Sequence, residues 1–591
     1  MASNQIMLRC SAVLRCTALW HFGVLWIALF LMPESIAAAE QVRPHVLFIA
    51  LDDLNDWIGV LGGHPQTITP NLDRLAASSV VFTNAHCAAP ACNPSRTAIF
   101  TGISPHHSGI YSNAQKMREV LPDVELLPKT LSRHGYYSTG SGKMLHYFID
   151  APSWDSYYPA AETENPFPRT FLPKDRPVNL PVGGPWQYVD TDWGALDVTD
   201  EQGGGDYLVT DYIIEQLAES HEDKPVFLAC GIYRPHEPWF VPQKYFEPFP
   251  LDSIQLPPGY REEDLNDVPE TGQRLARNRY FPHILREGKW KEGIQAYLAS
   301  IHYADAMVGR VLDALDNSEH ADNTIVVLWS DHGWHLGEKE HWQKYTGWRA
   351  STRVPLMIRV PEGVPGIPAG TQPGKCGRPV NLLSLAPTLL ELCGLPSEAQ
   401  HDGPSLVPLL KEPQADWPHV SVTYLHVPES YGLSAERWRL VHYQDGTEEL
   451  YDIQTDPYEW TNLIEDGQYA EQREQLRALA PKQFAPGPRP SVASLPSLKW
   501  NPLLQENVPA SAPDGNTLDV VFINQTEAVV KLWSVNQQGI PLLTSEIQPS
   551  QEYRQPTRPG EVWLITDRDD RGVGYFRVGD RSARAVVPAS K

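Results

Sequence analysis

The segment HVLFIALDD at residues 45–53 decides the fold class of this chain. An apolar run of this length that ends in polar residues is typical of a strand buried inside a parallel sheet. Two later segments follow the same plan. The run at 226–232 leads into Tyr-Arg-Pro-His at 233–236, and the run at 324–329 leads into Ser-Asp-His-Gly at 330–333.

Helical patterns separate these strands. Apolar residues recur at three- and four-residue spacing in 291–315, and shorter candidate helices at 126–134 and 382–392 are followed by Gly135 and Gly394, where C-caps belong. Strands alternating with helices predict an α/β fold whose mostly parallel sheet is flanked by helices on both faces. Because such sheets bind ligands beyond the carboxyl ends of their strands, we expect the three polar endings to converge on one site.

The first 39 residues have the organisation of a signal peptide. Arg9 and Arg15 precede an apolar stretch at 18–32, and three alanines at 37–39 follow it. This order predicts cleavage on export, with a signal anchor as the alternative, although the stretch is short for a membrane span. We therefore expect a secreted or periplasmic protein with no membrane span after cleavage.

Composition and charge narrow the class of protein. The 591 residues are 42% hydrophobic and 20% charged, which excludes a disordered chain or a coiled coil. The net charge of −24, with no block rich in Lys or Arg, argues against a nucleic-acid partner. We expect a main domain at 40–484 with a C-terminal subdomain from about residue 400. A Pro-rich linker at 485–515 and a small β domain at 516–591 follow.

An Asp-Asp pair and an Asp-His pair follow two of the predicted strands. Asp52 and Asp53 end one strand, and Asp331 with His332 ends another. Carboxylates gathered at adjacent strand ends repel one another unless a cation lies between them, which favours a divalent metal site. The alternative is a helix N-cap with a solvated neighbour, and the pattern alone leaves both open.

The segment ACNPSRTAIFTG at 91–102 resembles the signature of the type I sulfatases, Cys-x-Pro-Ser-Arg followed by a short helix and Thr-Gly. The resemblance runs from about Arg43 to about Asp466. Tyr-Arg-Pro-His-Glu-Pro at 233–238 and the Asp-His pair at 331–332 look most like the iduronate-2-sulfatase branch. The resemblance implies an alkaline-phosphatase-like fold for the 40–484 domain.

The resemblance also implies roles for particular residues. Cys92 would be oxidised to formylglycine by a formylglycine-generating or sulfatase-maturating enzyme, a transient partner. One calcium ion would be held by Asp52, Asp53, Cys92, Asp331 and His332. Arg96 would steady the formylglycine, Lys143 and His146 would contact the nucleophile and the sulfate, Lys344 would hold sulfate oxygens, and His236 would donate a proton to the leaving oxygen. The implied substrate is a sulfated glycan, with a 2-sulfated uronic acid at a chain end as the specific expectation.

The number of cysteines also draws attention to Cys92. Signal cleavage leaves five cysteines, namely Cys87, Cys92, Cys230, Cys376 and Cys393, so at least one lacks an internal partner. Conversion of Cys92 accounts for the odd one. The other four could form zero, one or two disulfides.

Two other functions compete with this one. One is that of a phosphatase or phosphonate esterase of the same superfamily, and a phosphatase would normally carry Ser or Thr at position 92 and a second metal cluster. A non-catalytic protein that binds sulfated glycans would have lost some site residues.

The C-terminal segment resembles the β-domain of the von Hippel–Lindau tumour suppressor, which implies a β-sandwich. Its Trp533 and Trp563 fit core positions better than exposed binding positions.

Overall fold

The computed structural model of this chain describes residues 43–589, except 161–164, 174–190, 222–223, 488–491, 493–494, 504–507 and 515–516. The three strands predicted from the sequence are present as β1 (His45–Leu51), β7 (Val226–Ile232) and β9 (Thr324–Ser330). They lie side by side and parallel, with Val46 of β1 opposite Phe227 of β7 and Ile325 of β9.

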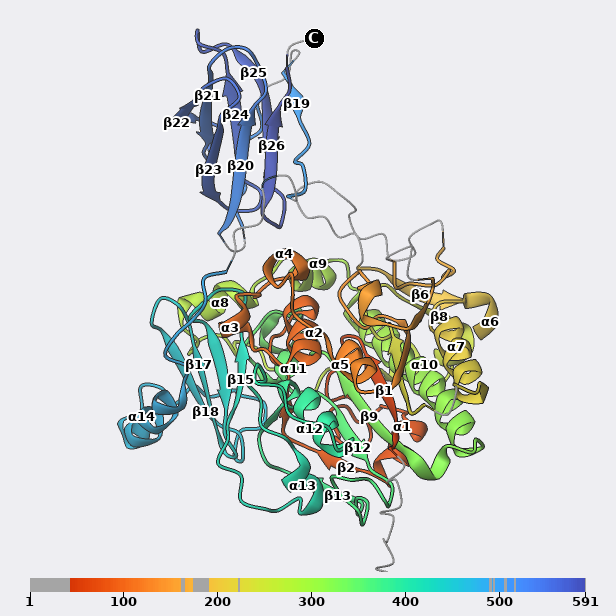
Figure 1. Cartoon of the computed structure of the whole chain (residues 1–591). Helices are drawn as coiled ribbons and strands as arrows, with labels where there is room; N and C mark the ends of the chain where they lie inside the picture. Colours follow the sequence, from red (N-terminus) through yellow and green to blue (C-terminus); the bar gives the residue numbers. More distant parts are fainter. Residues whose placement is uncertain are drawn as a thin grey trace, which may run out of the picture. The chain divides into compact units, whose positions relative to one another are not determined.

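These strands form the centre of an eight-stranded sheet in the order β13-β2-β12-β9-β1-β7-β4-β5. The other members are β2 (Val80–Phe82), β4 (Tyr137–Gly142), β5 (Ser156–Tyr158), β12 (Leu356–Arg359) and β13 (Gly374–Cys376). Figure 1 labels the members β13, β2, β12, β9 and β1 of this sheet. Only β12 runs antiparallel to its two neighbours in this sheet. The prediction of a mostly parallel sheet is confirmed.

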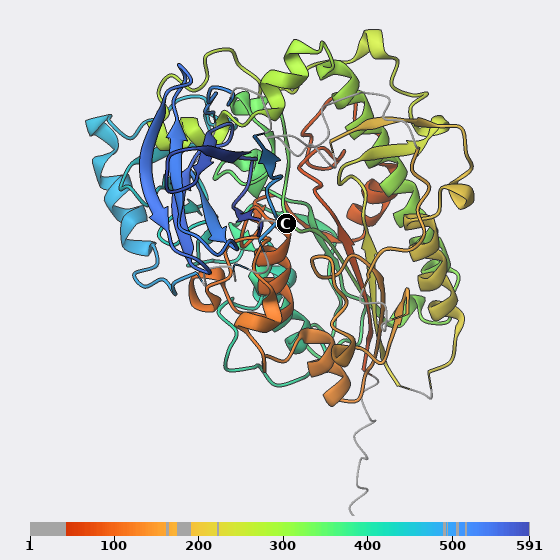
Figure 2. The same cartoon turned by 90° about the horizontal axis from the view of Figure 1, so that it is seen from above.

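Helices cover both faces of the sheet (Figures 1 and 2). One face packs against α1 (Pro70–Ala76), α7 (Asp206–Ala218) and α10 (Trp290–Asp316), and the other against α2 (Cys92–Thr101), α5 (Leu127–Arg133) and α12 (Leu385–Leu392). Successive side chains of a strand point to opposite faces, so Leu47 and Ile49 enter the first core and Val46 and Phe48 the second. Burial on both faces explains why β1 is apolar throughout.

A smaller antiparallel sheet follows the large one in the chain. It contains β15 (Ser421–Tyr424), β16 (Tyr431–Ser434), β17 (Trp438–His442) and β18 (Glu448–Asp452), followed by α14 (Ala470–Leu479). Arg439 of β17 is fully buried and pairs with Glu459 at 2.7 Å. This ion pair ties the antiparallel sheet to the loop that follows it.

The C-terminal region is an all-β sandwich of two sheets. Its strands are β19 (Asn501–Pro502), β20 (Leu518–Asn524), β21 (Val530–Val535), β22 (Pro541–Ile547), β23 (Glu552–Thr557), β24 (Val562–Thr566), β25 (Gly572–Arg577) and β26 (Ala583–Val587). Side chains of both sheets share one core around Phe522, Trp563 and Phe576. Trp533 is half-buried and donates from Nε1 to Thr566. Strand β19 lies within the segment predicted as a linker and pairs with β25.

Two sequence-level questions concern export and disulfides. The predicted signal peptide at 1–39 lies outside the described residues. In the part of the chain that the structure describes, no helix combines the length and the apolarity that a membrane span requires. All five described cysteines are buried and unpaired, so the option of zero disulfides is the one observed.

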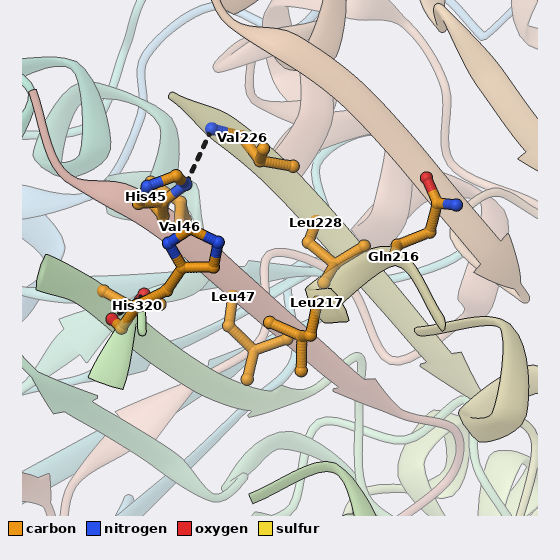
Figure 3. A pocket seen from close by; sticks show the side chains of 9 residues that line it. His45, Val46, Leu47, Gln216, Leu217, Val226, Leu228 and His320 are labelled. Carbon is orange, nitrogen blue, oxygen red and sulfur yellow. Dashed lines mark hydrogen bonds between the residues drawn. The ribbon is translucent and has the colours of Figure 1, made fainter. Parts of the chain in front are cut away.

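A very small cavity lies where β1 and β7 begin, far along the strands from their polar ends (Figure 3). Its volume of about 10 Å³ is close to the minimum that holds one water molecule. Burial lowers the pKa of His45 to about 4, so the neutral ring accepts a hydrogen bond from the Val226 amide through Nδ1 at 3.1 Å. This cavity is too small for a sugar or a sulfate ester.

Candidate active site

The polar strand endings converge as predicted. Asp52 and Asp53 follow β1, His236 lies four residues after β7, and Asp331 and His332 follow β9. Lys143 and His146 follow β4, the fourth parallel strand, while Cys92 and Arg96 lie on α2 and Lys344 follows β11 (Trp342–Gln343). All of the residues proposed from the sequence therefore lie at the carboxyl-end edge of the sheet or in loops beside it.

Cys92 lies at the centre of this site, at the first residue of α2. Its Sγ is 3.2 Å from Nζ of Lys344, 3.6 Å from Nζ of Lys143 and 3.3 Å from Nε2 of His332. Burial alone would raise the pKa of Cys92, but the two ammonium groups outweigh it and hold that pKa well below its ordinary value. The site is therefore built to stabilise negative charge at the side chain of residue 92.

The residues around Cys92 fix the start of α2. The Asn93 side-chain amide donates to the carbonyls of Ser112 and Gln115, at 3.0 and 2.7 Å. The Ser95 hydroxyl donates to the carbonyl of Asp331 at 2.7 Å. These bonds hold the N-terminus of α2 against a neighbouring loop and against the end of β9. Asn93 and Ser95 of the motif therefore stabilise the start of the helix.

Three buried carboxylates face three buried cations. Asp52 pairs with Arg96 at 3.1 Å and closely with Lys143, and these cations hold the pKa of Asp52 low against the opposing effect of burial. Asp53 pairs with Lys344 at 2.7 Å. Burial raises the pKa of Asp331 to about 6 although Arg96 lies 2.8 Å away.

The donor set fits a divalent cation. Ligand atoms of Asp52, Asp53, Cys92 and His332 all lie within 4.8 Å of one another. This separation matches ligands placed around one divalent cation. Asp53 Oδ2 is buried and has no hydrogen-bond partner, as expected of an atom reserved for a ligand.

Asp331, implied as a metal ligand by the family resemblance, lies beside the other four predicted ligands. It does not belong to the group of four, because its Oδ2 accepts from Arg96 and its Oδ1 accepts the amides of Asp53 and His332 at 3.1 Å each. The same Oδ2 is nevertheless 3.4 Å from Nε2 of His332. Asp331 thus borders the metal group and orients two of its members.

Two histidines border the site. Nδ1 of His236 contacts the carbonyl of Glu237 at 2.5 Å, which assigns the proton to Nδ1 in the neutral ring, and Nε2 lies 3.6 Å from Oδ2 of Asp53. Burial alone would lower the pKa of His236, but the Asp53 carboxylate outweighs it and the net shift is upward. Burial lowers the pKa of His146, whose Nδ1 has no hydrogen-bond partner. His236 is thus suited to be the acid and His146 the neutral base.

Sequence reasoning missed two aromatic side chains beside Lys143. The ammonium group of Lys143 lies 5.2 Å from the ring centroid of Tyr147 and 5.4 Å from that of Tyr233. Tyr233 belongs to the quoted motif at 233–238, but a tyrosine in a loop carries no signal of its own. His341 is buried, and its Nε2 contacts the Lys344 carbonyl at 2.8 Å, so it supports the Lys344 loop.

Comparison with known protein families gives two matches. Residues 44–395 match the family described as Sulfatase, and residues 337–483 match the family described as N-sulphoglucosamine sulphohydrolase, C-terminal. Both matches end before the C-terminal sandwich, so its likeness to the von Hippel–Lindau domain stays a prediction.

Individual relatives agree with these matches. A Formosa agariphila protein named Sulfatase is 39% identical over 76% of this chain and 88% of its own length. Mouse iduronate 2-sulfatase is 32% identical over 69% of this chain and 79% of its own length.

Solved structures share the fold at lower identity. One, described as a complex with its substrate D-glucosamine-2-N,6-O-disulfate, has a TM-score of 0.58 at 22% identity over 74% of this chain and 96% of its own. The phosphonate monoester hydrolase of Agrobacterium radiobacter has a TM-score of 0.56 at 23% identity, over 74% and 95%. Fold alone therefore does not separate sulfate from phosphonate chemistry.

Proposed function

The chain belongs to the sulfatase family, and on that premise we propose that it hydrolyses the sulfate monoester of a 2-sulfated uronic acid at the end of a sulfated glycan. One observation carries the reaction type. The buried side chain of Cys92, within Cys-x-Pro-Ser-Arg, lies between the ammonium groups of Lys143 and Lys344 and beside an acidic cluster that fits a cation.

Maturation and a metal belong to this proposal. Formylglycine made from Cys92 would supply, as its hydrate, one hydroxyl to attack sulfur and a second to release sulfate. A calcium ion held by Asp52, Asp53, residue 92 and His332, with Asp331 beside it, would supply positive charge at the nucleophile. A free thiol or a serine has no second hydroxyl, so conversion of Cys92 is required.

The chain's own cations prepare the site for an anionic substrate. Lys143 and Lys344 are buried, so their charges act on sulfate oxygens with little screening by water. Arg96 donates from Nε to Asp331 and from Nη2 to Asp52, and so keeps those carboxylates in place. The net charge of −24 makes such local cations necessary, because the whole chain repels anions.

Proton transfer is assigned to the two histidines. A sugar alkoxide is a poor leaving group, and His236, whose pKa is raised beside Asp53, donates a proton from Nε2 to the leaving oxygen. His146, whose pKa is lowered by burial, accepts the proton when sulfate is released. The two shifts in opposite directions suit one acid and one base.

The sugar specificity rests on relatives and on the quoted motifs. Besides mouse iduronate 2-sulfatase, a relative from Bacteroides thetaiotaomicron named Delta 4,5-hexuronate-2-O-sulfatase is 27% identical over 75% of this chain. Both names specify the 2-sulfate of a uronic acid. We further propose export by the signal peptide at 1–39 and transient binding of a maturation enzyme at Cys92.

Phosphonate ester hydrolysis is the second candidate, because phosphonate monoester hydrolases share the fold. The match of residues 44–395 to the family described as Sulfatase and the relatives at 39% and 32% identity favour the sulfatase. The test is a panel of desalted sulfated oligosaccharides, 4-nitrophenyl sulfate and phenylphosphonate esters, read as released sulfate or phosphonate, with Cys92→Ala as the blank. We expect release from a 2-sulfated uronic acid; faster release of phosphonate than of any sulfate would contradict the proposal.

A further inference from the structure

A cavity of about 760 Å³ adjoins the candidate active site. Residues of 165–172, 203–206 and 231–242 line it, together with Tyr147. Tyr147 and Tyr233 also flank the ammonium group of Lys143, so the cavity and the sulfate-binding residues share a wall. The volume lies within the range of about 300–1,000 Å³ that is usual for small-molecule sites.

The shared wall is aromatic. The ring of Phe167 lies 5.4 Å from that of Tyr147 and 5.1 Å from that of Tyr233, and Tyr233 stacks on His236 at 4.7 Å. Tyr147 has a φ of +58° and is 47% exposed. A bulky residue rarely adopts this conformation, and such outliers gather at ligand sites. The wall offers a face on which a sugar ring can stack.

One cation in this cavity has an unused donor. Arg234 is 4% exposed, and its Nη2 donates to the carbonyl of Phe240 at 3.1 Å. Its Nε is buried and has no hydrogen-bond partner. Among the residues that the structure describes, no carboxylate lies within 4.0 Å of this guanidinium. A buried, unpaired guanidinium donor is costly unless a ligand completes it.

The carboxylate of Asp206, which lines the same cavity, does not complete the guanidinium of Arg234. Both carboxylate oxygens of Asp206 are used by backbone amides, those of Tyr233 at 2.7 Å and Arg234 at 3.0 Å. Burial raises the pKa of Asp206, although the charge of Arg234 opposes that shift. Arg234 therefore remains available for an anion that enters the cavity.

We propose that this cavity binds the sugar ring of the substrate and that Arg234 determines specificity by pairing with the carboxylate of the sulfated uronic acid. The inference rests on the proposed function and extends it to a particular residue. A guanidinium fork matches the geometry of a carboxylate. The ammonium group of Lys143 lies 5.4 Å and the guanidinium of Arg234 5.3 Å from the Tyr233 ring centroid, so both charges border the same aromatic side chain.

The test compares two substrates that differ only in the carboxylate. They are the methyl glycoside of a 2-sulfated hexuronic acid and its counterpart with the carboxyl group reduced to a hydroxymethyl group. We expect Arg234→Gln to lower kcat/KM about 10- to 100-fold on the carboxylated substrate, mainly through KM. Hydrolysis of the reduced substrate and of 4-nitrophenyl sulfate should be unchanged. Equal losses on both sugar substrates, or no loss, would overturn the proposal.

Two variants and the wild type sharpen the result. Arg234→Lys keeps the charge but not the fork and should fall between the wild type and Arg234→Gln. Arg286→Gln removes an exposed cation that does not line this cavity and should leave kcat/KM unchanged on both substrates. A carboxylate-selective loss of the same size in Arg286→Gln would contradict the assignment to Arg234. If Arg234→Gln does not fold, the test is the preference of the wild type for the carboxylated sugar over the reduced one. Equal kcat/KM on the two sugars would refute recognition of the carboxylate by Arg234.

Failure of the proposed function gives a different pattern. Wild-type protein with formylglycine at residue 92 that releases sulfate from neither the sugars nor 4-nitrophenyl sulfate would refute the sulfatase reaction. Binding of the unsulfated hexuronic acid methyl glycoside, measured by calorimetry, then tests the cavity by itself. Binding that is weakened in Arg234→Gln supports the carboxylate site, and absence of binding contradicts it.

Discussion

Replacement of His236 by alanine tests the assignment of the general acid. In the structure, Nδ1 of His236 contacts the Glu237 carbonyl and Nε2 faces Oδ2 of Asp53, so only Nε2 can deliver a proton to the leaving oxygen. The Asp53 carboxylate raises the pKa of His236, which keeps the ring protonated above the ordinary histidine range.

The expected size follows from the leaving group. General acid catalysis contributes about 10²–10⁴-fold, or about 3–5 kcal/mol of barrier, when a poor leaving group must be protonated. His236→Ala should therefore lower kcat by that factor on a sugar sulfate. On 4-nitrophenyl sulfate the loss should stay below about tenfold, because a stabilised phenolate leaves without protonation.

The assay is initial-rate release of sulfate from both substrates across pH. For the wild type, activity on the sugar sulfate should fall as pH rises through the pKa of His236, because the acid form is lost. His236→Ala should lack this limb. His64→Ala is the matched control, since His64 is a buried histidine bonded to the Gln255 carbonyl. Equal losses on sugar and aryl sulfates would refute the assignment.

Three further perturbations probe the rest of the site. Cys92→Ala should abolish sulfate release while circular dichroism and the melting temperature show an intact fold, and turnover by this variant would exclude residue 92 as the nucleophile. Chelation of calcium should lower activity and the melting temperature together, with recovery on adding calcium; a protein indifferent to chelators contradicts the metal site. Arg96→Met leaves Asp52 and Asp331 without their buried partner and should cost about 3–5 kcal/mol in denaturant unfolding, whereas a loss below about 1 kcal/mol would show that the pairs are unimportant.

The sequence predicted the strands that are apolar along their whole length. β1, β7 and β9 were predictable because both faces of each strand are buried, so every position must be apolar. Strand β4 has the sequence YSTGSG and is buried without an apolar run. The hydroxyls of Ser138 and Thr139 are hydrogen-bonded, that of Ser138 to the Pro128 carbonyl at 2.8 Å, and no periodicity in the sequence predicts this arrangement.

The site was predictable to the extent that topology or a motif placed it. Asp52, Asp53 and Asp331 follow from the rule that ligands collect at the carboxyl ends of parallel strands. Lys143 and Lys344 followed only from the family resemblance, because an isolated lysine is usually a solvated one. Arg234 could not be recognised from the sequence as a ligand-binding candidate. Only the folded structure shows that its Nε is buried without a hydrogen-bond partner.

Mass spectrometry of the peptide that contains Cys92, taken from catalytically active protein, tests the central claim most directly. Conversion of the thiol to formylglycine predicts a peptide about 18 Da lighter than the encoded sequence, at a stoichiometry that tracks specific activity across preparations. Fully active protein whose residue 92 carries an intact thiol would contradict the account.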